Sequence, residues 1–185
     1  LDEMARLTEE PELQGMQLRF NELPAEDYAT SWKMSWKPFR VGPICLLPPW
    51  DEREVAAHEK RLTIQPGGSF GSGRHATTRT CVRVLTQRIK GGERVLDAGT
   101  GSGILSVVSA LLGAERCLGF DIDPYSAEAA GDLARDNHVE PQCTFRVGGF
   151  ETLQESETGF DVVLGNIYSD IIQLHAKDLA KRLAP

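Results

Sequence analysis

The stretch Val95-Leu96-Asp97-Ala98-Gly99-Thr100-Gly101-Ser102-Gly103-Ile104-Leu105 joins two apolar runs through three alternate glycines. This pattern predicts a buried β-strand, a tight turn and the start of a helix. Glycines let the backbone turn sharply and let a ligand approach it closely. The N–H groups at a helix start have no partner within the helix, so they can bind a ligand. The stretch therefore predicts a nucleotide-type cofactor site, with an ordinary strand-to-helix turn as the alternative.

Two features of this turn narrow the choice of cofactor. Gly99, Gly101 and Gly103 follow a G-x-G-x-G spacing, whereas dinucleotide sites have G-x-G-x-x-G. Asp97 lies at the strand end, where its carboxylate would repel a pyrophosphate and attract a cation. S-adenosylmethionine carries an ammonium and a sulfonium and has no phosphate. We therefore expect S-adenosylmethionine to be bound at this turn.

The composition is ordinary for a globular chain of 185 residues, with 41% hydrophobic and 25% charged residues. The formal net charge of −7 disfavours stable binding to nucleic-acid phosphates and is compatible with a basic protein partner. No apolar run is long enough for a membrane span or a signal peptide, so a cytoplasmic protein is expected. The cysteines show no C-x-x-C spacing, so no metal site is predicted. Cys117 and Cys143 are expected in buried strands.

The segment before the central turn predicts short elements. Tyr28, Trp32 and Trp36 recur every four residues and would share one helical face. We expect this face to pack against the main domain, with a binding surface as the alternative. Residues 41–47 predict one short strand, and residues 61–65 predict another.

A second glycine-rich stretch, residues 69–78, runs into a predicted helix that ends at the glycine pair 91–92. One of Thr77 and Thr78 is expected to cap the start of this helix, which leaves the other hydroxyl for a ligand. His75 has two interpretations: it acts as an acid or base, or it bonds the backbone and orders the turn.

Downstream of the turn, apolar periodicity predicts an alternating order of helices and strands. The elements expected are a helix at 104–112, a strand at 117–121, a helix at 125–137, strands at 142–147 and 160–165, and a helix at 169–183. Asp121 lies about twenty residues beyond the glycine turn, where an acid meets ribose hydroxyls in Rossmann-like sites. Asp123 precedes Pro124 and is expected to cap the next helix.

Two further candidates follow the third and fourth predicted strands. Asn166 ends the fourth strand and is expected to face the substrate at the ligand crevice, the alternative being a turn residue that caps the following helix. Phe150 and Glu151 follow the third strand and are expected to border and orient the adenine. The alternative is a solvated loop with one buried aromatic ring.

Together these residues resemble the class I S-adenosylmethionine-dependent methyltransferases, and specifically the bacterial ribosomal protein L-eleven methyltransferase family. Residues 70–78, Phe70-Gly71-Ser72-Gly73-Arg74-His75-Ala76-Thr77-Thr78, resemble the family's F-G-T-G-x-H-P-T-T loop. Residues 97–105 resemble its D-x-G-x-G-S-G-I-L. Asp121-Ile122-Asp123-Pro124 matches D-I-D-P, and Asn166-Ile167 matches the start of N-I-L.

The resemblance implies an α/β fold with a Rossmann-like methyltransferase sheet that is incomplete at its C-terminal end. Residues 1–60 would be a linker and the remnant of an N-terminal domain, and residues 61–185 would be the cofactor-binding domain. The residues implied at the cofactor or the reaction centre are Thr78, Gly99, Asp121 and Asn166, with Phe70, Gly101 and Gly103 shaping the pocket. The chain departs from the family at Ala76, in place of proline, and at Tyr168-Ser169, in place of a small apolar pair.

The implied function is protein N-methylation of a lysine or an N-terminal amine in a ribosomal protein. Asn166 would be the catalytic residue, because its amide oxygen can hold the N–H groups of the attacking amine. Three alternatives stay open: a methyltransferase for another protein lysine, a nucleic-acid base or a small molecule; an NAD-binding oxidoreductase; and a non-catalytic cofactor-binding module.

Overall fold

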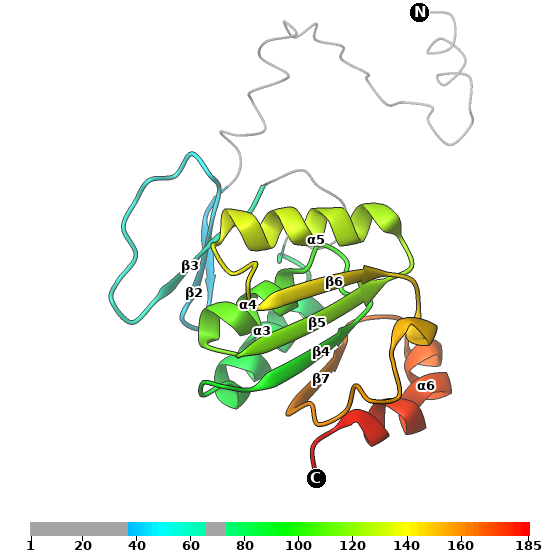
Figure 1. The fold of residues 1–185 in the computed structure, drawn as a ribbon. Helices are drawn as coiled ribbons and strands as arrows, with labels where there is room; N and C mark the ends of the chain where they lie inside the picture. Colours follow the sequence, from blue (N-terminus) through cyan, green and yellow to red (C-terminus); the bar gives the residue numbers. More distant parts are fainter. Residues whose placement is uncertain (1–36, 66–72) are drawn as a thin grey trace, which may run out of the picture. The chain divides into compact units, whose positions relative to one another are not determined.

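The computed structural model describes residues 37–65 and 73–185. The chain divides into two compact units, Leu1–Trp36 and Lys37–Pro185, and the described residues belong to the second. The aromatic stripe predicted at residues 28–36 and the predicted pocket residue Phe70 lie outside the described residues. The strands of the second unit are β1 (Phe39–Val41), β2 (Ile44–Leu47), β3 (Lys60–Thr63), β4 (Arg94–Ala98), β5 (Arg116–Asp121), β6 (Cys143–Val147) and β7 (Val162–Gly165). Its helices are α3 (Ala76–Arg88), α4 (Ile104–Leu112), α5 (Pro124–Asp136), the short 3₁₀ helix η2 (Phe150–Thr152) and α6 (Ser169–Arg182) (Figure 1).

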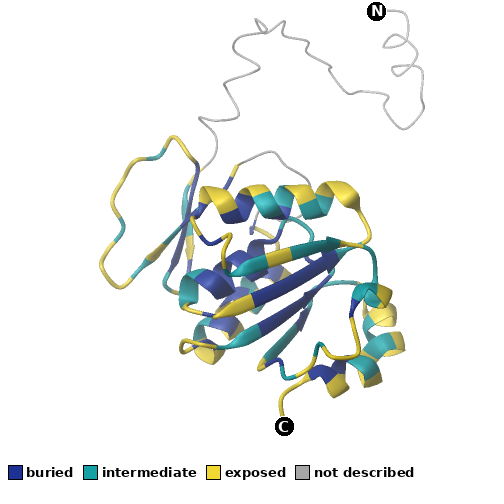
Figure 2. Ribbon diagram, viewed as in Figure 1, coloured by how far each residue is buried: buried dark blue, intermediate teal, exposed yellow. Residues whose placement is uncertain are grey.

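The main sheet is parallel and has the strand order β6-β5-β4-β7. Its strands are joined by α4, α5 and the η2 segment, so the predicted alternating α/β order is confirmed. Because side chains alternate along a strand, each strand contributes to both faces of the sheet. One face packs against α4 and α5, and the other carries the apolar cluster that includes Leu179 of α6. In Figure 2 the middle of β5 is buried, between an exposed first residue and a half-buried last residue.

Residues 39–47 form a hairpin, whereas the sequence predicted a single strand there. Val41 pairs with Ile44, so Gly42 and Pro43 make a two-residue loop. Gly42 has φ +58°, and glycine with positive φ at the first loop position is typical of type II′ hairpins. β2 then pairs in parallel with β3, and the predicted domain boundary at 60/61 lies within β3, after its first residue.

Helix α3 ends earlier than predicted. Its C-cap is Ile89 in an extended conformation, and the glycine pair 91–92 lies beyond the helix, so the predicted glycine cap is wrong. The Glu93 carboxylate accepts hydrogen bonds from the N–H groups of Lys90 and Gly91. The Glu93 side chain therefore binds the N–H groups that follow the helix, where the glycines were expected to form the cap.

The caps of α4 and α5 follow the sequence expectations. Gly113 ends α4 in the left-handed conformation, with φ +110°. Asp123 is the N-cap of α5 and accepts a hydrogen bond from the Tyr125 N–H at 3.0 Å, with Pro124 in the first helical turn. Within the described residues, no helix has both the length and the apolar character needed to cross a membrane.

Cys117 and Cys143 lie opposite each other on neighbouring strands of the main sheet. Cys117 is fully buried, and Cys143 is half-buried because β6 is the outer strand. The hydrogen bond to Cys143, together with burial, raises the pKa of the Cys117 thiol. Cys117 is therefore an apolar packing residue with little thiolate character.

Candidate functional site

The glycine turn between β4 and α4 has the geometry that its sequence predicts. Gly99, Gly101 and Gly103 have φ values of +68°, +53° and +76°, which L side chains rarely adopt. A Cβ on Gly103 would come within 2.6 Å of the Ala130 Cβ on α5. A Cβ on Gly99 would overlap the Ile167 side chain. Both positions therefore require glycine for two reasons, the backbone conformation and the close packing.

Asp97 is buried beneath this turn and is held by hydroxyl groups. Its Oδ2 accepts hydrogen bonds from Thr100 Oγ1 and Ser106 Oγ, each at 2.8 Å. Its Oδ1 is buried and has no hydrogen-bond partner among the described residues. Burial raises the pKa of this carboxyl group, which the two hydroxyl donors only partly counteract. The buried Oδ1 of Asp97 is therefore an acceptor that a cationic or N–H donor group would satisfy.

Asp121 ends β5 and turns its side chain back onto the glycine turn. Its Oδ2 accepts a hydrogen bond from the Gly101 N–H at 2.9 Å, and its Oδ1 accepts one from the Asp123 N–H at 3.0 Å. These two bonds fix the carboxylate at the carboxyl edge of the sheet. Each oxygen keeps a further lone pair, so the group can accept hydrogen bonds from a ligand as well.

Thr78 and Asn166 come together at the same edge although 88 residues separate them in sequence. The Asn166 side-chain N–H₂ donates a hydrogen bond to Thr78 Oγ1 at 3.3 Å. Thr78 is buried on α3, and Asn166 follows β7. The next residue, Ile167, is the one whose side chain fills the space beside Gly99. The Thr78–Asn166 pair therefore borders the glycine turn.

His75, and neither threonine, is the N-cap of α3. Its Nδ1 accepts a hydrogen bond from the Thr77 N–H and lies 2.8 Å from Thr77 Oγ1. The predicted threonine cap is wrong, because an imidazole nitrogen can accept at this position as a hydroxyl oxygen would. The backbone-ordering interpretation of His75 matches this contact, and Thr78 is left to face Asn166.

Phe150 lies in the η2 segment after β6, where it is half-buried and contacts two other aromatic rings. The His175 ring on α6 stacks on it at 3.7 Å between centroids, and the Phe120 ring meets it edge-on at 5.1 Å. Glu151 folds back to accept a hydrogen bond from the Gly149 N–H at 2.6 Å. These two contacts reduce the ring surface that is left for the predicted contact of Phe150 with adenine.

Several residues of the site were not predicted from the sequence. Thr100 and Ser106 hold Asp97, and Ser106 could have been recognised as a buried serine in the apolar helical run 104–112. Ile122 and Tyr125 follow Asp121 and are 80% and 81% exposed, so they offer apolar surface beside the carboxylate. Their exposure has no signature in the sequence, because an apolar residue near a helix start is usually buried.

The sequence matches a known protein family over nearly its whole length. The model of the family described as ribosomal protein L11 methyltransferase (PrmA) matches residues 2–185. The chain belongs to this family. A ribosomal protein L11 methyltransferase from Syntrophotalea carbinolica is 40% identical over 179 residues, 95% of the chain. The enzyme from Deinococcus radiodurans is 37% identical over 169 residues, 90% of the chain.

Solved structures agree with the family assignment. A ribosomal protein L11 methylase from Lactobacillus delbrueckii subsp. bulgaricus matches with a TM-score of 0.70 and 25% identity, over 80% of this chain and 75% of that one. An RNA methyltransferase from Salinibacter ruber, in complex with S-adenosyl-L-homocysteine, shares the fold with a TM-score of 0.50 and 23% identity, over 57% of this chain and 69% of that one. The predicted class I methyltransferase fold is confirmed. The chain spans 57% and 62% of the lengths of the two curated family members.

Proposed function

We propose that the protein containing this chain transfers a methyl group from S-adenosylmethionine to amino nitrogens of a ribosomal protein. One observation carries the proposal: the Asp121 carboxylate is held against the glycine turn by the Gly101 N–H, at the carboxyl edge of the sheet. Ligands of open α/β sheets bind at this edge. Membership of the L11 methyltransferase family supports the same reaction class.

Asp121 would hold the ribose of the cofactor. Each of its oxygens accepts one backbone N–H and has a lone pair left for a ribose hydroxyl. Hydrogen bonds to a charged group contribute roughly 1.5–3 kcal/mol each. Two such bonds would raise the affinity by roughly two to four orders of magnitude. The exposed Ile122 beside it offers an apolar surface to the adenine.

Asp97 and the glycine turn fit the charged end of the same cofactor. The buried Oδ1 of Asp97 lacks a partner, and an ammonium group or the water that it binds would satisfy it. Gly99, Gly101 and Gly103 carry no side chain, so a ligand can approach the backbone of the turn closely. A pyrophosphate would instead meet two carboxylates, Asp97 and Asp121, so this arrangement disfavours a dinucleotide.

Asn166 would position the attacking amine. S-adenosylmethionine supplies an electrophilic methyl group on a sulfonium, so the leaving group is already activated. The hydrogen bond to Thr78 orients the Asn166 amide with its nitrogen toward Oγ1, which leaves Oδ1 to accept from an amine N–H. Holding the amine by its N–H groups turns its lone pair toward the methyl group, and such alignment supplies most of the rate increase.

The expected acceptor is an amine that is neutral or easily made neutral. A protein α-amine has a pKa of roughly 7.7–8.0, whereas a lysine has about 10.4, so N-terminal methylation needs little assistance. His75 is used as the cap of α3, and the site therefore works best on an amine that needs no strong general base.

The test uses the full-length protein. Calorimetry should detect binding of S-adenosylhomocysteine and no binding of NAD. Radiolabel should pass from S-adenosylmethionine to ribosomal protein L11 in preference to other ribosomal proteins. Binding without transfer to any protein would favour a non-catalytic module, and transfer to RNA alone would overturn the protein substrate.

A further inference from the structure

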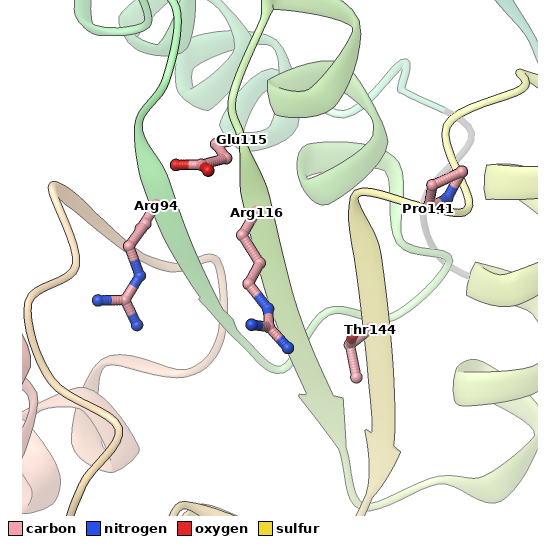
Figure 3. Close-up of a pocket in the computed structure, with 5 residues that line it drawn as sticks. All are labelled: Arg94, Glu115, Arg116, Pro141 and Thr144. Atoms are coloured by element: carbon pink, nitrogen blue, oxygen red, sulfur yellow. The ribbon is translucent and has the colours of Figure 1, made fainter.

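A pocket lies at the opposite end of the main sheet from the proposed cofactor edge. It has a volume of about 320 Å³ and is lined by Arg94, Glu115, Arg116, Pro141 and Thr144. The residues come from the amino ends of β4, β5 and β6 and from the loops that lead into these strands (Figure 3). A strand of five residues is about 16 Å long, so this pocket is separate from the glycine turn.

Register brings the two arginines together. Arg94 and Arg116 are partners across the β4–β5 pair, and Thr144 is the partner of Leu118, two residues after Arg116. All three side chains therefore point to the same face of the sheet. Figure 3 shows the two guanidinium groups side by side, with the Thr144 side chain next to that of Arg116.

The two guanidinium groups differ in their contacts. Arg94 donates to the carbonyl oxygens of Thr158 and Gly159 through a single terminal nitrogen, and its guanidinium lies 5.1 Å from the centre of the Phe160 ring. Arg116 is exposed, and among the described residues its side chain makes no hydrogen bond or ion pair. Like charges opposite each other on neighbouring strands are destabilising, so an anion between the two arginines would be stabilising.

Arg146, another arginine on the same face of the sheet, does have partners for its guanidinium group. Arg146 of β6 forms two hydrogen bonds with the Glu157 carboxylate, at 2.9 and 2.6 Å, and a third with the Thr152 carbonyl. The fork of a guanidinium matches the two oxygens of a carboxylate or phosphate. Among the described residues Arg116 makes no such contact, and the pocket beside it has a volume of about 320 Å³.

We propose that this pocket binds a small oxyanion, a phosphate or a carboxylate group, between Arg94 and Arg116, with the Thr144 hydroxyl as a further donor. The volume of about 320 Å³ is at the lower end of the range for small-molecule sites, which favours a small ligand. The net charge of −7 and the Glu115 carboxylate in the pocket wall disfavour a long polyanion such as RNA.

The test is a titration of the full-length protein with inorganic phosphate in dilute chloride buffer, followed by the amide NMR shifts of residues 94, 116 and 144. Saturable shifts with a dissociation constant on the order of 1 mM are expected. Arg116→Gln should weaken binding at least about tenfold, because a charged donor is lost. Glu115→Gln should strengthen it several-fold, since it removes the only acid of the pocket.

The matched control is Arg83→Gln, which removes the same charge from an exposed position of α3. It should leave phosphate binding within twofold of the wild type. Equal weakening by Arg83→Gln and Arg116→Gln would show an adventitious ion only and would overturn the proposal. So would the absence of any strengthening by Glu115→Gln.

Two further titrations distinguish the sources of the oxyanion. Succinate should compete with phosphate if the site accepts carboxylates, and a failure to compete would restrict it to phosphate. A short single-stranded RNA that binds through Arg116 a hundredfold more tightly than phosphate would replace the small-molecule site with a nucleic-acid site. Binding of S-adenosylhomocysteine should be unchanged in Arg116→Gln, because the cofactor edge lies at the other end of the strands.

Discussion

The two ends of the main sheet differ in how their polar groups are satisfied. At the carboxyl end, Asp121 is bonded to the Gly101 N–H, Asp97 to two hydroxyls, and Asn166 to Thr78. At the amino end, Arg116 has no such bond among the described residues. At the carboxyl end, each strand leads into a helix whose first N–H groups have no partner within the helix. Side chains bind these groups instead. The polar groups of that edge are therefore held in place before a ligand arrives, whereas at the amino end Arg116 is available to the proposed oxyanion.

The strongest test of the organised end is Asp121→Ala. Affinity for S-adenosylhomocysteine should fall by roughly two orders of magnitude or more, because the variant loses the ribose acceptor and the bond to Gly101. Calorimetry on the full-length protein measures this loss. Asp123→Ala is the matched control: it removes the cap of α5, costs about 1 kcal/mol of stability, and should change the affinity little. Equal losses in both variants would refute the special role of Asp121.

The rigidity of the turn is tested by Gly99→Ala. The new Cβ would overlap Ile167 at a backbone conformation of φ +68°, so unfolding in denaturant should become easier by roughly 2–4 kcal/mol. Gly91→Ala is a useful reference, because its φ is +120° and its surroundings are empty, so it reports the backbone term alone. The double variant Gly99→Ala with Ile167→Ala should recover part of the difference. No recovery would mean that Ile167 is not what closes the turn.

A smaller effect is expected from the Thr78–Asn166 pair. Asn166→Ala should lower the turnover number at least about tenfold while the affinity for S-adenosylhomocysteine stays within a few-fold, since the amide is proposed to hold the amine. Thr78→Val should have a weaker effect in the same direction, because it removes only the group that orients the amide. If Asn166→Ala keeps full turnover, the positioning role is wrong.

The smallest effect concerns the arginine that does have a partner. The hydrogen bonds from Arg146 lower the pKa of Glu157, so the pair stabilises the fold above the unfolded pKa of about 4.3 and loses this contribution as the pH falls through the lower folded value. Glu157→Gln should therefore cost about 1–2 kcal/mol at pH 7 and nothing below about pH 2.

Denaturant unfolding of the wild type and the variant across this pH range measures the difference. Glu155→Gln, at an exposed neighbouring position, should show no comparable pH dependence. A constant difference between wild type and Glu157→Gln at all pH values would contradict the ion-pair account.

The sequence predicted the main sheet well because its signals are local. The apolar runs before Asp97, Asp121 and Asn166 each predicted a strand in the right place, although β7 begins two residues later than predicted. Pro124 after Asp123 marked the start of α5. The hairpin at 39–47 was missed because Gly42 reads equally well as an interruption within one strand. The end of α3 was misplaced because Glu93, which binds the N–H groups there, follows the glycines in sequence.

The features of the site also divide into those that the sequence predicts and those that only the structure shows. The sequence by itself determined the α/β order, the glycine turn and the polar residues that end the strands, since each depends on residues a few positions apart. Only the tertiary structure decided that Thr78 meets Asn166, that Ile167 closes the turn at Gly99, and that Arg94 stands beside Arg116. These contacts join elements that are distant in sequence, and the order and register of the strands, which no local pattern specifies, create them.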